Sequence, residues 1–117
     1  MLASIYLISS RDFEKVKKEG KLVQQKNFGV IIRKRNDDNP PKFGFVISTK
    51  ISKLAVHRNR IKRAMNEAAR RNVDSVPPGH DLLFLVKTTM EKMTTEEIMN
   101  DVVKYLRNFK KDEKNNA

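Results

Sequence analysis

The sequence predicts an α+β fold, in which a small, mostly antiparallel sheet and a layer of helices form a two-layer α/β sandwich. Two observations predict this class. Apolar residues alternate over 22–35 and 42–49, which indicates strands, and they recur every three or four residues over 57–71 and 98–109, which indicates helices. An apolar run at 81–87 follows the 57–71 helix, so this helix is expected to cross over between two strands of the same sheet.

The first helix is predicted to begin after Ser9. Ser9 suits the N-cap position, Asp12 follows three residues later, and Ile8 and Phe13 have the spacing of a hydrophobic staple. Gly20 is expected to end the helix. The simplest interpretation places Phe13 in the core.

Two strands are expected next, at 22–35 and 42–49. The sequence Asn-Asp-Asp-Asn-Pro-Pro between them predicts a turn, because Asn and Asp favour turns and proline cannot donate to a strand ladder. The two strands are therefore expected to pair as an antiparallel hairpin. Phe28, Phe43 and Phe45 are either core residues, which is the simpler interpretation, or exposed platforms on which unpaired bases stack.

The 57–71 helix separates apolar residues from charged ones. Its inward stripe, at helical spacing, consists of Ile61, Ala64, Met65 and Ala68. The positions opposite that stripe are Asn59, Arg63, Asn66 and Arg70. The two flanks carry Arg58 and Lys62 on one side, and Arg60 and Arg71 on the other.

The charge on this helix indicates a polyanionic partner. Six Arg or Lys residues lie between 58 and 71 against one acid, Glu67. A solvated helix face is the ordinary explanation of such a run, but it does not require one sign of charge. Five of the six cations are arginine, whose planar guanidinium matches phosphate oxygens bidentately and stacks on bases. We therefore predict that the helix binds RNA.

The last third of the chain is predicted to complete the sandwich. The strand at 81–87 is almost entirely apolar and is expected to be buried on both faces. Thr94 and Glu97 have the spacing of a capping box before the last helix. Acids lie early and cations late in that helix, which complements the helix dipole without a functional role.

Composition limits the chain to one RNA-binding domain, residues 1–110, with a polar tail at 111–117. A net charge of +11 and a pI near 10.1 favour nucleic acid over an acidic membrane surface as partner. Cysteine is absent, which excludes disulfides, zinc knuckles and thiol catalysis. The apolar residues 1–8 lack the features of a signal peptide, and no apolar run approaches the ~20 residues of a membrane span. We expect a cytoplasmic protein with no membrane partner.

The sequence offers little for catalysis. His57 and His80 belong to different elements, and His57 is either a phosphate ligand or a capping or surface residue. Asp37 and Asp38 lie in a proline-bounded turn, where a solvated loop is the expected state. The four glycines do not form a nucleotide-binding loop. We therefore predict no catalytic residue, no metal site and no cofactor bound by the protein itself.

The hexapeptide Arg58-Asn-Arg-Ile-Lys-Arg63, preceded by Lys50-Ile51 and Ala55-Val56, resembles the signature of the protein subunit of bacterial ribonuclease P. Further matches occur in the same order as in that family. They are Arg11-Asp-Phe13, Gly20-Lys21, Phe28 and Gly79-His-Asp81. The resemblance covers roughly residues 10–107 and implies a left-handed crossover through the basic helix.

The resemblance also implies a function. In that family the RNA subunit carries out the metal-dependent cleavage that matures the 5′ end of transfer RNA, so magnesium is expected in the RNA-containing holoenzyme. The protein binds ribonuclease P RNA and the leader of precursor transfer RNA, and no protein partner is required. The implied contacts with the RNA subunit are Arg58, Asn59, Arg60, Lys62, Arg63 and Arg70. The implied leader-binding cleft contains Phe13, Lys17, Phe28 and Lys50.

Several positions depart from the family pattern. Lys17 and Ile31 stand where the family has cleft aromatics, and Ser52 replaces a glycine in a loop that is one residue longer. Residues 1–10 contain no Arg or Lys, although the family has a basic segment there. We expect a leader grip that depends more on charge. The alternatives are a ribosomal or other structured-RNA binding protein and, less well supported because strands flank the basic helix, a helix-turn-helix DNA binder.

Overall fold

The computed structural model describes residues 2–110, so the tail expected at 111–117 lies outside the described residues. The elements, in chain order, are η1 (Ser4–Tyr6), α1 (Ser10–Glu19), β1 (Lys21–Gln24), β2 (Phe28–Lys34), β3 (Lys42–Val46), α2 (Ala55–Arg71), η2 (Val73–Ser75), β4 (His80–Val86), η3 (Thr88–Met90) and α3 (Thr95–Arg107). None of the described helices is long and apolar enough to cross a bilayer.

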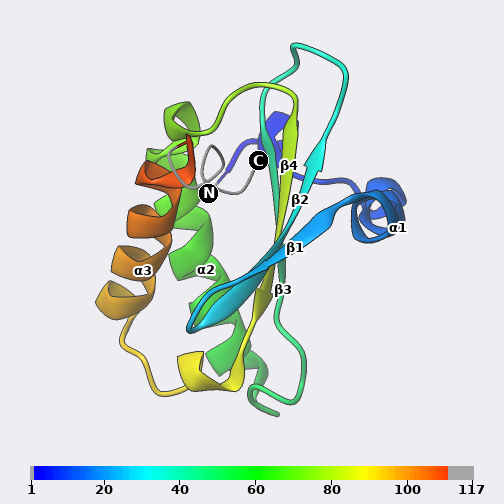
Figure 1. Ribbon diagram of the computed structural model, residues 1–117. Coiled ribbons are helices and arrows are strands. Elements are labelled where there is room, and N and C mark those ends of the chain that lie inside the picture. Colours follow the sequence, from blue (N-terminus) through cyan, green and yellow to red (C-terminus); the bar gives the residue numbers. More distant parts are fainter. Residues whose placement is uncertain (1, 111–117) are drawn as a thin grey trace.

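The four strands form one sheet in the order β1-β2-β4-β3. β1 pairs with β2 and β2 with β4 antiparallel, whereas β3 and β4 are parallel and joined through α2. Figure 1 shows α2 and α3 together on one face of the sheet and α1 on the other. The predicted α+β class, the mostly antiparallel sheet and the crossover helix are confirmed. The short α1 adds a partial third layer to the predicted sandwich.

The prediction of one strand over 22–35 was wrong. The chain turns at residues 25–27, where the Gln25 amide donates to the Phe28 carbonyl at 2.9 Å, and β1 and β2 form a hairpin. The polar sequence Gln-Gln-Lys-Asn at 24–27 interrupts the apolar alternation. That interruption was the available signal for the turn.

The expected antiparallel pairing of β2 with β3 was also wrong, because β4 lies between them. Leu82, Leu83 and Phe84 are all fully buried, so β4 needs helices over both faces and a strand on each side. The central place in the sheet meets that need. Local turn sequence cannot reveal such an insertion by a strand about 40 residues later in the chain.

The core has a large part and a small part. The large part lies between the sheet and the α2–α3 layer and includes Phe28, Phe43 and Phe45, which confirms the core interpretation of these residues. Phe28 packs against Phe84 at 5.3 Å between ring centroids and edge-on against Tyr105 at 5.6 Å. The small part lies beneath α1.

The helix ends follow local sequence. The Ser9 side chain accepts a hydrogen bond from the Asp12 amide at 3.3 Å, and Gly20 is the C-cap of α1, as expected. The capping box at α3 is present, with the Glu97 amide donating to the Thr94 hydroxyl at 3.1 Å and Glu97 accepting from the Thr94 amide at 2.9 Å. α2 begins two residues before its predicted start at 57.

Candidate RNA interface

The orientation of α2 follows the predicted stripe. Ile61, Met65 and Ala68 are fully buried and Ala64 nearly so, against the sheet and α3. Arg63 is exposed on the other side. Because the apolar stripe fixes the rotation of the helix, the polar positions of α2 are presented in one defined direction.

Asn66 is an exception to the predicted outward face. It is 4% exposed, and its side-chain amide donates to the Lys62 carbonyl at 3.1 Å, which satisfies the buried group within the helix. Its neighbour Ala69 is buried too. The buried side of α2 is therefore broader than the four-residue stripe, and Asn66 contributes nothing to the exposed face.

The six residues expected to contact the RNA subunit divide by their partners. Asn59, Lys62 and Arg63 are exposed, and within residues 2–110 their side chains form no hydrogen bond or ion pair. Arg58 is half-buried and donates to the Ser52 carbonyl at 2.7 Å. Arg60 is half-buried and donates to the Met93 carbonyl at 3.1 Å. The two arginines of the Arg-Asn-Arg sequence thus brace neighbouring loops, and the residues between and after them project freely.

Arg70 is exposed as expected, but it shares an acid. It forms a two-pronged contact with Glu67, through Nε at 3.1 Å and through Nη2, while Arg71 Nε reaches the same carboxylate at 3.1 Å. These hydrogen bonds, that of Arg70 foremost, lower the pKa of Glu67 from 4.5 to about 2. The C-terminal turn of α2 therefore presents two cations around one ionised acid.

The residues expected in the leader cleft are not all brought together. Phe13 and Lys17 lie one turn apart on α1, where Phe13 is half-buried against the α1 side of the sheet. A Cβ at Gly44 would lie 3.1 Å from the Phe13 ring and 2.8 Å from a Leu83 methyl, so glycine allows this close approach. The Lys17 side chain is half-exposed and lies 3.8 Å from Glu14.

The placement of Phe28 differs from the cleft assignment. Phe28 is 2% exposed and faces the α2–α3 layer, whereas Ile31 faces α1. Alternation along β2 requires this separation, because residues 28 and 31 differ by an odd number of positions. Base stacking on Phe28 is therefore incompatible with this fold. Lys50 is exposed in the loop after β3.

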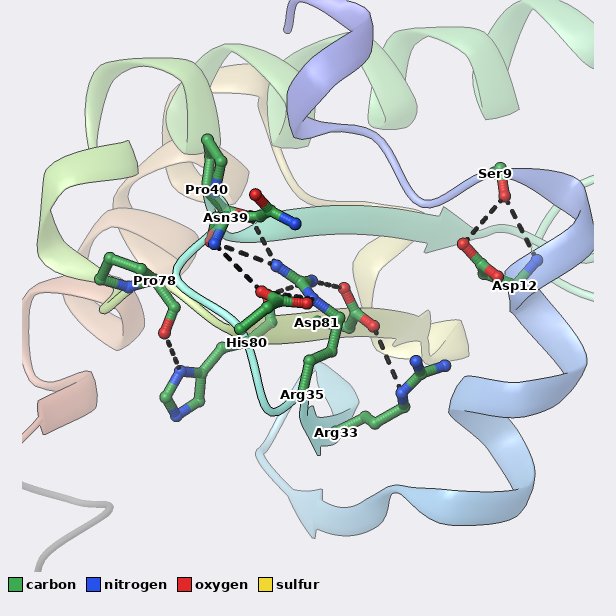
Figure 2. A network of polar contacts seen from close by, with 10 residues as sticks. Ser9, Asp12, Arg33, Arg35, Asn39, Pro40, Pro78, His80 and Asp81 are labelled. Carbon is green, nitrogen blue, oxygen red and sulfur yellow. Dashed lines mark hydrogen bonds and ion pairs between the residues drawn. The ribbon is translucent and has the colours of Figure 1, made fainter.

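A buried polar network on the α1 side of the sheet was missed in the sequence (Figure 2). The Asp81 side chain, 3% exposed, lies between Arg35, which contacts it through Nη1, and Arg33, whose Nε is 3.6 Å away. Arg35 also reaches Asp37 through Nε at 3.1 Å and the Pro40 carbonyl through Nη2 at 2.8 Å. These contacts fasten the β2–β3 connection to the start of β4.

Gly79 completes that fastening. Its φ is +78°, and a Cβ would lie 2.6 Å from the Asp37 carbonyl oxygen. Its amide donates to the Asn39 carbonyl at 2.9 Å, and its carbonyl accepts from the Arg35 amide at 2.7 Å. The sequence Gly79-His-Asp81 is thus explained by a close backbone crossing and an ion-pair anchor.

The two histidines lie in different elements, His57 in α2 and His80 in β4. The His57 Nδ1 and the Ser52 hydroxyl are 3.4 Å apart at its N-terminus, whereas the His80 Nδ1 lies 3.0 Å from the Pro78 carbonyl at the start of β4. Among residues 2–110 no group of three or more His, Asp or Glu side chains could hold a metal ion. Asp37 is exposed in its loop, and the hydrogen bond from Arg35 lowers its pKa.

Comparison with known proteins identifies the family to which this chain is similar. The family model described as Ribonuclease P matches residues 1–110. The ribonuclease P protein component of Macrococcus caseolyticus is 34% identical over 106 residues, covering 87% of this chain and 90% of that protein. That of Clostridioides difficile is 35% identical over 88 residues, covering 74% of this chain and 75% of the relative.

A solved structure has a similar fold. This structure is of a Staphylococcus aureus RNase P protein mutant described as having defective mRNA degradation activity. It superposes with a TM-score of 0.78 at 26% identity, covering 91% of this chain and 88% of the other. Fold, basic helix and sequence relatives lead to one conclusion: the chain belongs to the family of ribonuclease P protein components.

Proposed function

We propose that this chain is the RNA-binding, non-catalytic subunit of ribonuclease P, working in the cytoplasm on precursor transfer RNA. Family membership supplies the role in transfer-RNA processing together with an RNA subunit. The observation that best supports an RNA-binding role is the exposure of Asn59, Lys62 and Arg63. These residues lie on a helix locked to the core and have no partner within residues 2–110, in a chain of net charge +11.

The α2 surface suits an RNA backbone. Lys62 and Arg63 supply cations that form no ion pair within residues 2–110, and Arg63 can hold a phosphate with two parallel hydrogen bonds. Arg58, Arg60 and Arg70 extend the positive field, although each is already engaged by a protein group. Counterion release on phosphate binding then makes the affinity depend strongly on salt.

The α1 side suits the leader of the precursor. The Phe13 ring is partly accessible for base stacking, and Lys17 provides a positive charge one turn away on α1. Phe28 is buried in the core on the other face of the sheet. The grip on the leader accordingly relies on one partly accessible aromatic and on charge. We propose that Lys50 reaches the same RNA from the loop after β3.

Catalysis is assigned to the RNA subunit with magnesium, and no protein partner is invoked. The separated histidines and the lack of a metal-holding acid cluster in residues 2–110 support this assignment. The test is reconstitution of the purified chain with a bacterial ribonuclease P RNA at low magnesium, scoring cleavage at the mature 5′ end of a precursor transfer RNA. Cleavage should require both components.

The same experiment includes the protein alone on precursor transfer RNA and on a messenger RNA. This arm is needed because the name of the Staphylococcus aureus structure connects that protein with mRNA degradation. We expect no cleavage by the chain alone. Degradation that copurifies with the chain and disappears in Arg63→Ala would contradict a purely RNA-binding role. A failure to stimulate the RNA subunit would contradict the proposal as a whole.

A further inference from the structure

A groove lies between α2 and the beginning of α3. Its volume is about 680 Å³, within the roughly 300–1,000 Å³ typical of small-molecule sites. Its walls include Val56, Asn59, Arg63, Ala64, Thr95 and Met99. We call it the α2–α3 groove. Figure 1 shows α2 in green and α3 in orange side by side along this layer.

Two exposed aliphatic residues at the start of α2 are poorly explained by folding alone, and one of them, Val56, lines the groove. Val56 is 67% exposed in the first turn of α2, where a polar or unbranched residue would suit the helix better. Leu54 occupies the N-cap position, where it provides no side-chain hydrogen bond, and it is exposed as well. Exposed aliphatic side chains that are close together beside a groove are typical of a ligand-binding surface.

The polar groups of the groove complement a nucleotide. Arg63 is exposed and unpaired within residues 2–110, and its guanidinium can hold a phosphate. Asn59 is likewise unpaired and carries both a donor and an acceptor for a base edge. The acid in the groove wall, Glu67, is engaged by Arg70 and Arg71, so it does not repel an anion as a free carboxylate would.

Other occupants fit less well. A second copy of this chain carries a net charge of +11 and would bring like charges together at Arg63. A partner helix would require a longer apolar stripe than Val56, Ala64 and Met99 provide. A nucleotide needs only a short aliphatic platform for its base and one cation for its phosphate, which is what the α2–α3 groove contains.

Resting on the proposed function, we propose that the α2–α3 groove takes one unpaired nucleotide of the RNA subunit. The base lies on the side chains of Val56 and Met99, Asn59 hydrogen-bonds its edge, and Arg63 holds its phosphate. Proteins recognise single-stranded RNA elsewhere by splaying a base onto a side-chain platform, usually an aromatic one, and hydrogen-bonding the base edge. In the α2–α3 groove the platform is aliphatic. The groove thereby adds a base-stacking contact to a helix that otherwise binds phosphates.

The test is equilibrium binding of the full-length chain to ribonuclease P RNA over a range of salt concentrations. Val56→Thr combined with Met99→Gln keeps side-chain size and charge but removes the aliphatic platform. We expect about 4- to 15-fold weaker binding, as for the loss of one or two buried methylene groups, with an unchanged slope of log affinity against log salt. The matched control is Ile5→Thr, since Ile5 is 57% exposed but lies outside the groove. It should bind within twofold of the wild type.

Cross-linking then identifies the occupant. The chain has no cysteine, so Val56→Cys and, as a control, Ile5→Cys each provide a single attachment point for a photoreactive probe. We expect the probe at position 56 to cross-link to one nucleotide in an unpaired region of the RNA subunit. A cross-link to a second copy of the protein, or an RNA cross-link equally strong from position 5, would overturn the proposal.

The binding experiments distinguish an error in the groove proposal from an error in the proposed function. If the wild-type chain binds and stimulates the RNA subunit but the groove variant binds equally tightly, only the groove proposal is overturned. If the wild-type chain neither binds nor stimulates the RNA subunit, both are overturned. Circular dichroism and thermal unfolding of the variants establish that weaker binding does not arise from unfolding.

Discussion

The Arg58 guanidinium donates a 2.7 Å hydrogen bond to the main-chain carbonyl of Ser52, six residues earlier in the chain. The first arginine of the Arg-Asn-Arg sequence therefore holds the loop that leads into α2. The Ser52 hydroxyl accepts from the Leu54 amide at 3.2 Å in the same loop. Arg58 and Ser52 together fix the residues just before Leu54, the N-cap residue of α2, which provides no side-chain hydrogen bond.

This contact predicts that Arg58 matters for stability and Arg63 does not. Arg58→Ala removes a hydrogen bond from a charged donor and should lower the free energy of unfolding by about 1 to 3 kcal/mol. Arg63→Ala removes an exposed side chain and should change it by no more than about 0.5 kcal/mol. Urea unfolding of the two variants measures the difference. Equal stability of the two would show that Arg58 does not brace the loop.

Asp81 is predicted to be the most important acid for folding. Asp81→Asn leaves Arg33 and Arg35 without their shared buried partner, and removal of one member of a buried ion pair costs about 3 to 5 kcal/mol. Asp38→Asn, in the exposed β2–β3 connection, is the matched control. Thermal or denaturant unfolding should separate the two variants. Similar midpoints would mean that the network in Figure 2 contributes little to stability.

The Glu67 carboxylate predicts a pH effect in the acid range. Its pKa is lowered from 4.5 to about 2 in the folded chain, so the ionised form is favoured by folding. Its stabilising effect is complete above pH about 4.5 and is lost as the pH falls towards about 2. Glu67→Gln should therefore weaken the pH dependence of stability in this window. An unchanged slope of stability against pH between these limits would contradict the assignment.

Glu67 also limits the charge available to RNA. Glu67→Gln frees Arg70 and Arg71 from their shared acid, so the same variant should bind RNA more tightly than the wild type at low salt. Weaker binding would show that the acid positions Arg70 rather than competing for it.

Phe13 and Phe28 are predicted to have separate effects. Phe13→Leu should reduce the preference for a precursor that carries a 5′ leader, because Phe13 lies half-exposed on α1. Phe28→Leu should lower the unfolding free energy by about 1 to 3 kcal/mol and leave the leader preference unchanged, because Phe28 is packed against Phe84 and Tyr105. The measurements are competition between precursor and mature transfer RNA, and denaturant unfolding. If Phe28→Leu lost the leader preference and Phe13→Leu kept it, the assignment of Phe13 to leader binding and Phe28 to the core would be contradicted.

Local patterns predicted what local forces determine. The stripe Ile61, Ala64, Met65 and Ala68 set the rotation of α2 because helical periodicity is a property of neighbouring turns. The caps at Ser9 and Thr94 followed from residues three positions apart. The cationic α2 surface was predictable for the same reason.

Long-range contacts explain the rest. The insertion of β4 between β2 and β3 depends on the crossing of Arg35 with Gly79 and Asp81, more than 40 residues later. The bracing role of Arg60 depends on a loop 33 residues away. Phe28 could have been excluded from the cleft, since strand alternation alone separates it from Ile31.

The central claim, that the exposed cations of α2 bind the phosphates of the RNA subunit, is tested most directly by salt dependence. The measurement is the slope of log affinity for ribonuclease P RNA against log salt concentration, for wild type, Lys62→Ala with Arg63→Ala, and the control Lys104→Ala with Arg107→Ala. Both double variants remove two exposed cations, from α2 and α3 respectively. Two lost phosphate contacts should reduce the slope of the α2 variant by about 1.4 to 1.8, at roughly 0.7 to 0.9 for each contact. The control should retain the wild-type slope. Equal reductions in both variants would contradict the claim, because binding would then follow net charge and not the face of α2.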